Sequence, residues 1–374
     1  MLLCTILYRG GFMKSLFTRM AAGLLAAVLF FPAEVSAISA QNAILEDAQT
    51  GCVLYEKNAN NRVLIASTTK IMTALVICEQ ANILDLVRIP KEAVGIEGSS
   101  IYLQEGEILS VHDLLLGLML HSGNDAAIAL AIYCGGTVDG FVDLMNDKAY
   151  FLGLTDTHFA NPHGLDDKDN YSTAGDMSTL AAYAMENPIF RKIVSTKTCN
   201  IGRRTLRNHN KMLWRFEGAD GVKTGFTKAS GRILVSSALR NGRRLICVTM
   251  DDPNDWEDHL NLFEHGFSQY TLYQIIAEGT VLGSIAVAGG TAGYAQLVAD
   301  NDFQYPLVDG EEVSIIIRPE NFVYAPVIRG KEAGVAYICI NGKPVGKVNL
   351  CFGDTIEMTQ ELVRPFWKRI FKGD

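Results

Sequence analysis

The chain has 374 residues, of which 48% are hydrophobic, and this length allows about two domains with a substantial core. Its formal net charge of −8 argues against a nucleic acid as a partner. The 8 cysteines include no Cys-x-x-Cys pair and the histidines show no ligand spacing, so we expect no disulfide framework, no metal and no cofactor.

The first 37 residues have the composition of a signal peptide. Lys14 and Arg19 precede the apolar run Met20–Phe31, and a small-residue site ends at Ala37. This order is typical of export signals, so we expect cleavage after Ala37 and an extracytoplasmic protein. The apolar run is short for a membrane span, although an uncleaved anchor is the alternative.

After the signal, the pattern predicts a hairpin followed by a buried helix. The β-prone runs Ile44–Ala48 and Cys52–Tyr55 flank the turn Gln49–Gly51. The apolar run Ile71–Ile77 is typical of a buried helix with Ser67 near its N-terminus. The helix dipole and the free N–H groups at that end favour negative charge that develops there.

The start of this helix carries a Ser-x-x-Lys motif, formed by Ser67 and Lys70. Residues three apart share a helix face, so the Lys70 amine can activate the Ser67 hydroxyl as a nucleophile. Taken alone, the motif is equally well explained by a capping serine and an exposed lysine. The interpretation as a catalytic pair therefore depends on the two motifs that follow.

A second motif, Ser122-Gly123-Asn124, lies between helices predicted over 113–120 and 125–133. It offers another hydroxyl and an amide. Taken alone, Ser-Gly-Asn is most often a turn. The neighbouring His121 allows an alternative pairing of serine with histidine, but Lys70 already supplies a base.

A third motif, Lys223-Thr224-Gly225, is predicted at a strand edge. Strands expected over 233–235 and 245–248 follow it, joined by a turn at Asn241-Gly242. The motif offers a cation, a hydroxyl and a glycine that lets substrate approach the backbone, and an extended peptide could pair with the edge. In this order, the three motifs predict a serine acyl-transfer site with lysine as its base.

The rest of the pattern predicts two domains. Strands flank a mostly helical centre, about 68–190, and a closing helix is expected over 258–276. This order predicts an α/β sandwich over 38–276, in which helices cover an antiparallel sheet. Over 279–358, short β-rich runs alternate with Gly and Pro turns, including Asn341-Gly342, which predicts a small all-β sandwich domain.

The last residues, 359–374, predict a basic amphipathic segment. A helical projection separates an apolar half from a basic half. The apolar half contains Leu362, Val363, Phe366, Trp367, Ile370 and Phe371, and the basic half contains Arg364, Lys368, Arg369 and Lys372. Trp and Phe opposite cations are typical of an interfacial membrane anchor. Pro365 leaves only about two helical turns, so we expect weak, peripheral membrane binding. A terminal helix packed on the β-domain is the alternative.

With these motifs in view, the chain resembles the D-alanyl-D-alanine carboxypeptidases, which are low-molecular-mass penicillin-binding proteins. The resemblance runs from about Gln41 to the C-terminus and includes Asn161–Leu165, Tyr171–Ala174 and Lys223–Thr227. It implies a β-lactamase/transpeptidase-like fold and removal of the terminal D-alanine from the peptidoglycan stem pentapeptide. It also implies covalent inhibition by β-lactams and a place on the outer face of the cytoplasmic membrane.

The resemblance also implies a role for each motif residue. Ser67 is the nucleophile, Lys70 the base, and Ser122 the relay that passes a proton to the leaving amine. Asn124 binds the substrate amide, Lys223, Thr224 and Gly225 form the carboxylate-binding strand, and the backbone N–H groups of Ser67 and Phe226 hold the oxyanion. Some relatives carry an arginine where this chain has Asn208-His209-Asn210, so we assign no arginine to the carboxylate.

Two other functions remain open at this point. A β-lactamase shares all three motif types, but class A enzymes use Ser-Asp-Asn and a deacylating glutamate before Lys-Thr-Gly. Here Glu186 and Glu217 fall in that interval without a matching context. The second alternative is a cell-wall-binding protein with a degenerate catalytic fold, against which the intact Ser67, Lys70 and Lys223 argue.

Overall fold

The computed structural model describes residues 4–8, 37–317 and 322–359. The chain divides into two units, one of Phe31–Tyr270 and one of Thr271–Asp374 with Met1–Phe30. Apart from residues 4–8 and 37, the predicted signal peptide lies outside the described residues, and so does the amphipathic segment after residue 359. Within the described ranges, no single helix is long and apolar enough to cross a membrane.

The first unit is built on a five-stranded antiparallel sheet. Its strands follow the order β10 (Ala219–Thr227), β11 (Gly231–Arg240), β12 (Arg243–Met250), β2 (Asn42–Asp47) and β3 (Val53–Lys57). The predicted opening hairpin is β2–β3. The predicted turn at Asn241-Gly242 joins β11 to β12, and both of its residues have positive φ, as a type I′ turn requires. The strand with the third motif, β10, lies at the edge.

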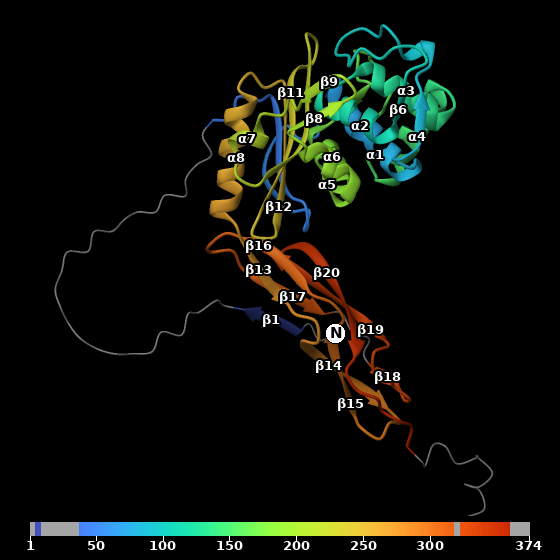
Figure 1. The fold of residues 1–374 in the computed structure, drawn as a ribbon. Coiled ribbons are helices and arrows are strands. Elements are labelled where there is room, and N and C mark those ends of the chain that lie inside the picture. Colours follow the sequence, from blue (N-terminus) through green and yellow to red (C-terminus); the bar gives the residue numbers. More distant parts are fainter. Residues whose placement is uncertain (1–3, 9–36, 318–321, 360–374) are drawn as a thin grey trace, which may run out of the picture. The chain divides into compact units, whose positions relative to one another are not determined.

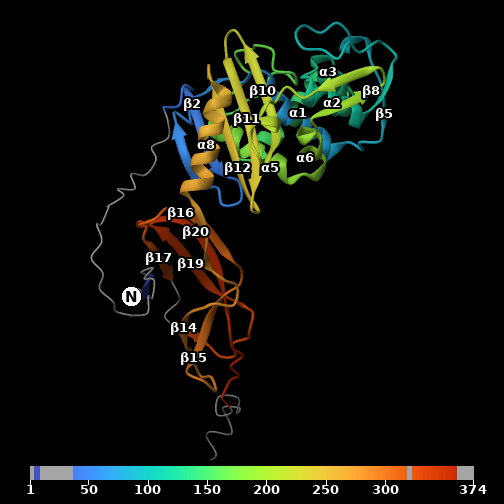
Figure 2. The ribbon, with the colours of Figure 1, turned by 60° about the vertical axis from the view of Figure 1, so that its left-hand side comes forward.

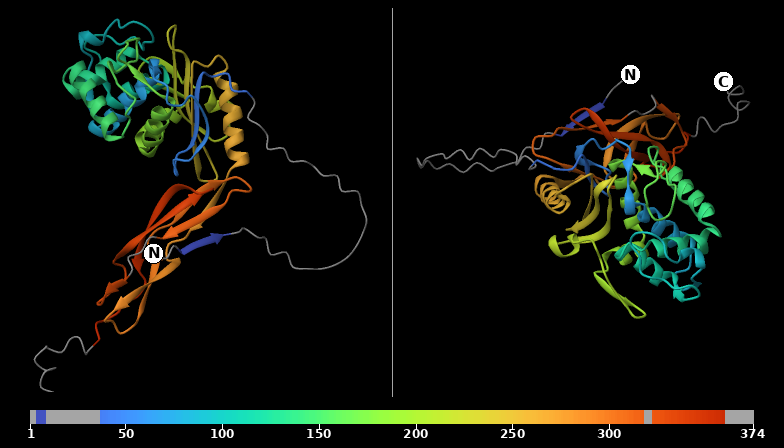
Figure 3. Two further views of the ribbon diagram at one scale, coloured as in Figure 1. Left: turned by 180° about the vertical axis from the view of Figure 1, so that it is seen from behind. Right: turned by 90° about the horizontal axis from the view of Figure 1, so that it is seen from above.

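Helices cover this sheet on both faces (Figure 3). The helices of the unit are α1 (Lys70–Gln80), α2 (Val111–Leu120), α3 (Asn124–Gly135), α4 (Val138–Phe151), α5 (Ala174–Glu186), α6 (Pro188–Ser195), α7 (Met212–Arg215) and α8 (Asp255–Gln269). Successive strand residues point to opposite faces. Val235 therefore packs in the core that contains α1 and α5, whereas Leu234 packs with Phe263 of α8. The predicted α/β sandwich is confirmed.

Short elements complete the first unit. They are two 3-10 turns, η1 (Ala66–Thr69) and η2 (Lys91–Ala93), and three small strand pairs, β4 (Val63–Leu64) with β7 (Tyr171–Ser172), β5 (Leu86–Arg88) with β6 (Ile108–Ser110), and β8 (Thr198–Ile201) with β9 (Arg204–Arg207). Of these, β6, β8 and β9 are labelled in Figure 1 and β5 in Figure 2. Strand β4 runs directly towards η1, which contains Ser67. Tyr171 pairs with Leu64, so a segment far along the chain holds the approach to this serine.

The second unit is all-β and has its own core, which confirms the predicted C-terminal domain. Its strands are β13 (Thr271–Ile276), β14 (Val281–Ala288), β15 (Tyr294–Ala299), β16 (Phe303–Leu307), β17 (Val313–Ile317), β18 (Phe322–Tyr324), β19 (Glu332–Ile340) and β20 (Lys343–Phe352). With β1 (Cys4–Tyr8) they form a seven-stranded sheet, β1-β17-β19-β20-β15-β14-β18, and the pair β13-β16. The predicted hairpin at Asn341-Gly342 joins β19 to β20.

The closing helix ends earlier than the pattern predicts. Helix α8 stops at Gln269, and Thr271–Ile276, expected as its last turns, is instead strand β13. A short run with Leu and Ile residues fits either structure by periodicity alone. Pairing with β16 decides the outcome, because Thr271 to Gln274 lie opposite Leu307 to Gln304. The expectation of a helix to Ile276 was therefore wrong.

Candidate active site

The Ser-x-x-Lys pair lies where η1 passes into α1. Lys70 is the first residue of α1 and is fully buried, with an exposed fraction of 0%. Its Nζ lies 3.0 Å from Ser67 Oγ. Ala66, just before the serine, has a φ of +44°, an unusual backbone conformation for a residue with a side chain. The alternative of an exposed lysine behind a capping serine does not fit this geometry.

The surroundings of Lys70 favour a neutral amine. Its Nζ donates to Asn124 Oδ1 at 2.7 Å and to the backbone oxygen of His163. Burial lowers the pKa of Lys70 well below its usual value, the charge of Lys223 lowers it further, and Asp125 partly offsets the shift. A neutral amine beside a hydroxyl is able to accept its proton.

The second motif lies between α2 and α3. Ser122 is 5% exposed and has a φ of +64°, and its hydroxyl forms no hydrogen bond with a described residue. Asn124 begins α3 and links two elements, because its Oδ1 accepts from Lys70 while its Nδ2 donates to the oxygen of Glu97 at 2.6 Å. The motif therefore fixes the Asn124 amide against Lys70, and it leaves the Ser122 hydroxyl without a partner among the described residues.

The carboxylate of Asp125, which the sequence analysis did not single out, holds the loop beside this motif. It accepts from Ser100 Oγ at 2.7 Å, from Ile101 N at 3.1 Å and from Leu103 N at 3.0 Å. An N-terminal helix position also suits a carboxylate, because of the helix dipole. Asp125 is 1% exposed, so these hydrogen bonds replace the water that the carboxylate would otherwise bind.

The third motif lies on β10, which contacts η1 and α1. Strand β10 and helix α1 are labelled in Figure 2. Lys223 is 1% exposed, and its Nζ donates to the oxygen of Thr224 at 2.8 Å. Burial lowers the pKa of Lys223 to about 7. Phe226, at the predicted oxyanion position, has a side chain that is largely exposed. The edge of β10 thus presents a cation, a hydroxyl and backbone groups beside Ser67.

Gly225 has a structural reason in addition to the predicted approach of substrate. A Cβ atom at this position would lie 3.3 Å from Ala66 Cβ, from the oxygen of Ile65 and from Thr68 Cγ2. The missing side chain therefore lets β10 lie against η1. The approach of substrate to this glycine stays a prediction. The glycine brings the third motif close to the first.

The loop 161–165 supports the nucleophile. In the sequence, this loop stands out only as part of the family resemblance. Gly164 has a φ of +83°, and a Cβ there would lie 1.9 Å from the oxygen of Ala66. The loop also supplies the His163 oxygen to Lys70, and the Pro162 oxygen accepts from Thr73 Oγ1 at 2.7 Å. A local signal was present, since Asn161 Oδ1 accepts from Gly164 N in a short turn, but the sequence does not reveal its target.

Two histidines near the site, His163 and His209, have strongly lowered pKa values. Burial and the charge of Lys70 lower the pKa of His163 to about 4. The pKa of His209 is also about 4, lowered by burial, by Lys223 and by His121. The rings of His121 and His209 lie 4.9 Å apart, and His121 has no hydrogen bond to Ser122 or Ser67. The nearby Arg207 is engaged elsewhere, because its guanidinium carbon lies 5.0 Å from the centre of the Trp214 ring.

All of the predicted site residues lie in the first unit, and the direct contacts above join Ser67, Lys70 and Asn124. The arrangement contains a hydroxyl nucleophile, a buried amine whose pKa is lowered, a second hydroxyl without a partner among the described residues, and a buried lysine on an edge strand. Among the described residues, no group of histidine, cysteine, aspartate and glutamate could hold a metal ion. The chemistry that this set supports is acyl transfer to a serine.

Comparison with known proteins agrees with this chemistry. Residues 30–254 match the family model described as D-alanyl-D-alanine carboxypeptidase, and residues 270–358 match the C-terminal domain of penicillin-binding protein 5. The chain is 32% identical to D-alanyl-D-alanine carboxypeptidase DacF of Bacillus subtilis, over 81% of this chain and 82% of the relative. It is 31% identical to DacC of Escherichia coli, over 92% and 93%. The crystal structure of penicillin-binding protein 5 from Haemophilus influenzae superposes with a TM-score of 0.77 at 30% identity, covering 86% of this chain and 98% of that one.

Proposed function

The chain belongs to the D-alanyl-D-alanine carboxypeptidase family of serine hydrolases, and we propose that it removes the terminal D-alanine from peptidoglycan stem peptides through an acyl-enzyme on Ser67. The single observation that carries this proposal is the fully buried Lys70 amine, 3.0 Å from Ser67 Oγ. A lysine in that position serves as a base only when it is neutral, and its surroundings lower its pKa in that direction.

The first half of the reaction breaks the bond between the two D-alanines. Ser67 Oγ attacks the carbonyl carbon of the penultimate D-alanine while Lys70 takes the hydroxyl proton. The backbone N–H groups of Ser67 and Phe226 stabilise the oxyanion. Ser122, whose hydroxyl is free of partners among the described residues, relays a proton to the leaving amine, and D-alanine departs. Water then hydrolyses the ester on Ser67.

The edge strand β10 binds the peptide. An extended substrate pairs with the free edge, which places its terminal carboxylate beside Lys223 and Thr224. Asn124 donates to the substrate amide carbonyl, because one N–H of its Nδ2 group remains after the other has bonded the Glu97 oxygen. His209 is neutral near neutral pH, so Lys223 supplies the charge for the carboxylate.

The same site explains reaction with β-lactams, whose strained amide presents a carbonyl to Ser67. A β-lactamase is not favoured, because the glutamates before the third motif lie away from the nucleophile. Glu186 ends α5, and Glu217 precedes β10 with its backbone oxygen bonded to Arg240. The partners of Lys70 among the described residues are a hydroxyl, an amide oxygen and the backbone oxygen of His163, and none of them is a carboxylate. The penicilloyl ester should therefore persist.

Export and membrane association are further parts of the proposal, and their support is in the sequence. The charge and apolar order before Ala37 favours export, and the basic amphipathic residues 359–374 favour the outer face of the cytoplasmic membrane. Cleavage after Ala37 would remove β1 and leave β17 as an edge strand of the second unit. The net charge of −8 argues against nucleic acid as a partner.

Mass spectrometry of a stem pentapeptide after incubation with the protein tests the activity. We expect the loss of one D-alanine to give a tetrapeptide, and no loss with Ser67→Ala. Cleavage at another bond, or none, would contradict the proposal. A fluorescent penicillin separates the alternatives, because persistent labelling indicates a carboxypeptidase, rapid turnover a β-lactamase, and no labelling a degenerate catalytic fold.

A further inference from the structure

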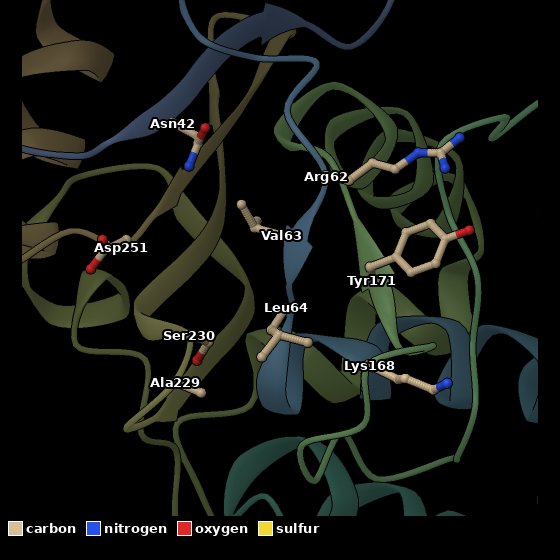
Figure 4. Close-up of a pocket in the computed structure, with 9 residues that line it drawn as sticks. All are labelled: Asn42, Arg62, Val63, Leu64, Lys168, Tyr171, Ala229, Ser230 and Asp251. Carbon is tan, nitrogen blue, oxygen red and sulfur yellow. The ribbon is translucent and has the colours of Figure 1, made fainter.

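A polar cavity of about 440 Å³ lies in the first unit, beside the motif residues but outside them (Figure 4). Its walls come from the start of β2, from β4, from the turn after β10, from the loop before β7 and from the residue that follows β12. They include Asn42, Leu64, Lys168, Ser230 and Asp251. In Figure 4, β4 runs between two groups of these side chains, with Asn42, Ser230 and Asp251 on one side and Lys168 on the other. None of the catalytic steps described above uses this cavity.

The cavity lies along the path of the substrate. Leu64 precedes Ser67 by three residues and Ala229 follows Phe226 by three, so each is at most about 11 Å from the site residue along the chain. A peptide that pairs antiparallel with β10 and places its carboxylate at Lys223 continues, in its preceding residues, towards Thr227 and the turn at Ala229. The residues before the two D-alanines therefore reach this cavity.

The charges of the cavity are available to a ligand. Lys168 and Asp251 form no ion pair or side-chain hydrogen bond with a described residue. Arg62, by contrast, is paired with Asp156 at 2.8 Å. Lys168 has acidic neighbours in sequence, Asp166, Asp167 and Asp169, but none of them lines the cavity. One wall thus presents an unpaired cation and another an unpaired carboxylate.

Asn42 adds an uncommitted polar group on the carboxylate side. Its side chain is 5% exposed and forms no hydrogen bond with a described residue, although it lines the cavity. Buried amides are normally hydrogen-bonded, so an unbonded one beside an unpaired carboxylate suits a polar ligand. Ser230 is already engaged, because its Oγ donates to the oxygen of Gly231 at 3.0 Å.

We propose that this cavity is a subsite for the charged part of the stem peptide that precedes the two D-alanines, with a side-chain ammonium at Asp251 and Asn42 and a free carboxylate at Lys168. The ligand class is an extended peptide that carries the two opposite charges on different residues. The proposal rests on the proposed carboxypeptidase function, which it extends from the cleaved bond to the preference among stem peptides.

Three synthetic pentapeptides ending in D-Ala-D-Ala test the subsite through kcat/KM. The first has a free side-chain amine and a free carboxylate, the second has the amine acetylated, and the third has the carboxylate amidated. We expect Asp251→Asn to lower kcat/KM about two- to fivefold for peptides with a free amine and to have no effect on the acetylated one. Asparagine tolerates the positive φ of +49° at this position, so the fold is preserved.

The second variant tests the other charge. Lys168→Ala should lower kcat/KM by a similar factor for peptides with a free carboxylate and leave kcat/KM of the amidated peptide unaffected. Lys168→Glu should make the amidated peptide a better substrate than the peptide with the free carboxylate. The exposed residues Lys192 and Asp143 provide matched controls, since Lys192→Ala and Asp143→Asn should change no peptide preference.

The outcomes separate the subsite from the proposed function. Release of D-alanine from an N-acyl-D-Ala-D-Ala dipeptide by the unaltered enzyme establishes the carboxypeptidase activity independently. If the variants then change all three peptides by the same factor, or change none, the subsite is overturned while the activity stands. If the unaltered enzyme cleaves neither the dipeptide nor any pentapeptide, both proposals fail.

Discussion

At the scale of single residues, the chemistry depends on the protonation state of two buried lysines. Lys70 is fully buried beside Ser67, and Lys223 is 1% exposed on the adjacent strand. Removing an ammonium group from water disfavours its charged form, and each lysine also raises the cost of charging the other. The two groups have opposite requirements, because Lys70 must be neutral to accept a proton whereas Lys223 must be charged to bind a carboxylate.

Replacing Lys70 by arginine separates charge from basicity. Arginine keeps a cation near Ser67, but its guanidinium does not deprotonate and cannot accept the hydroxyl proton. We expect Lys70→Arg to slow acylation by penicillin by about 10²- to 10⁴-fold, as is typical for loss of a general base. Stopped-flow or quenched labelling measures the rate. Near-normal acylation would place the base elsewhere, with His121 the first residue to examine.

The second residue-scale prediction concerns pH. The pKa of Lys223 is about 7, so its positive charge is lost as the pH rises through that value. For a substrate with a free terminal carboxylate, kcat/KM should therefore fall above about pH 7, because this ratio reports the free enzyme. A substrate whose terminal carboxylate is blocked as an ester or an amide should not show this alkaline decrease in kcat/KM.

Both substrates should share the decrease on the acid side, where Lys70 becomes protonated. His163 and His209 have pKa values of about 4 and stay neutral throughout the neutral range, so they do not add a step there. Identical alkaline limbs for the two substrates would show that Lys223 does not provide the charge for the carboxylate.

At the scale of elements, two glycines let separate segments meet at η1. Gly225 allows β10 to lie against Ala66 and Thr68, and Gly164 allows the loop 161–165 to approach the Ala66 backbone. The same loop gives Lys70 one of its three partners, the oxygen of His163. The nucleophile is thus positioned by contacts from both sides of a short turn.

Gly164→Ala tests this support. A Cβ would lie 1.9 Å from the oxygen of Ala66, so the loop must move and the contact with Lys70 is disturbed. We expect the acylation rate to fall at least about tenfold. Separately, the positive φ should strain the alanine and destabilise the fold by about 1–2 kcal/mol.

Gly153→Ala is the matched control for this prediction. Gly153 has a φ of +72°, but nothing lies within 4 Å of its Cβ position. The control should lower the free energy of unfolding, measured in urea, by about 1–2 kcal/mol without changing acylation. Equal acylation rates for the two variants would show that the loop does not position the site.

The sequence was sufficient to predict the parts of the site that depend on local patterns. The apolar run after Lys70, the turn at Asn241-Gly242 and the edge position of Lys223 each follow from a few neighbouring residues, and the structure has them as expected. The partner of Lys70 across 93 residues could not be predicted, because a backbone oxygen has no residue-type signature. Likewise, β13 was mistaken for helix because only its pairing with β16 distinguishes the two.

At the scale of the whole molecule, the chain combines a catalytic unit with a β-domain that has its own core. The three motifs and the polar cavity all belong to the first unit, so none of the proposed chemistry requires a residue of the second. The residues after 359, which lie outside the described part, carry the sequence features of a membrane anchor.

Deleting residues 361–374 tests this division of roles. We expect the truncated protein to keep its soluble carboxypeptidase activity and to lose binding to anionic vesicles, because each cation near the surface contributes about 1 kcal/mol. Co-sedimentation with vesicles of mixed anionic and neutral lipid measures binding, and neutral vesicles provide the control. If the truncated and mature full-length proteins sediment alike, the anchor proposal is wrong.

The central claim is that Ser67 is the nucleophile of an acyl-enzyme, and locating the covalent adduct tests it most directly. The protein is treated with penicillin, digested, and analysed by mass spectrometry, with Ser67→Ala treated in parallel. The account predicts one penicilloyl group, on the peptide that contains Ser67, and no adduct in the variant. An adduct on Ser122 or any other residue, or labelling that survives in Ser67→Ala, would contradict it.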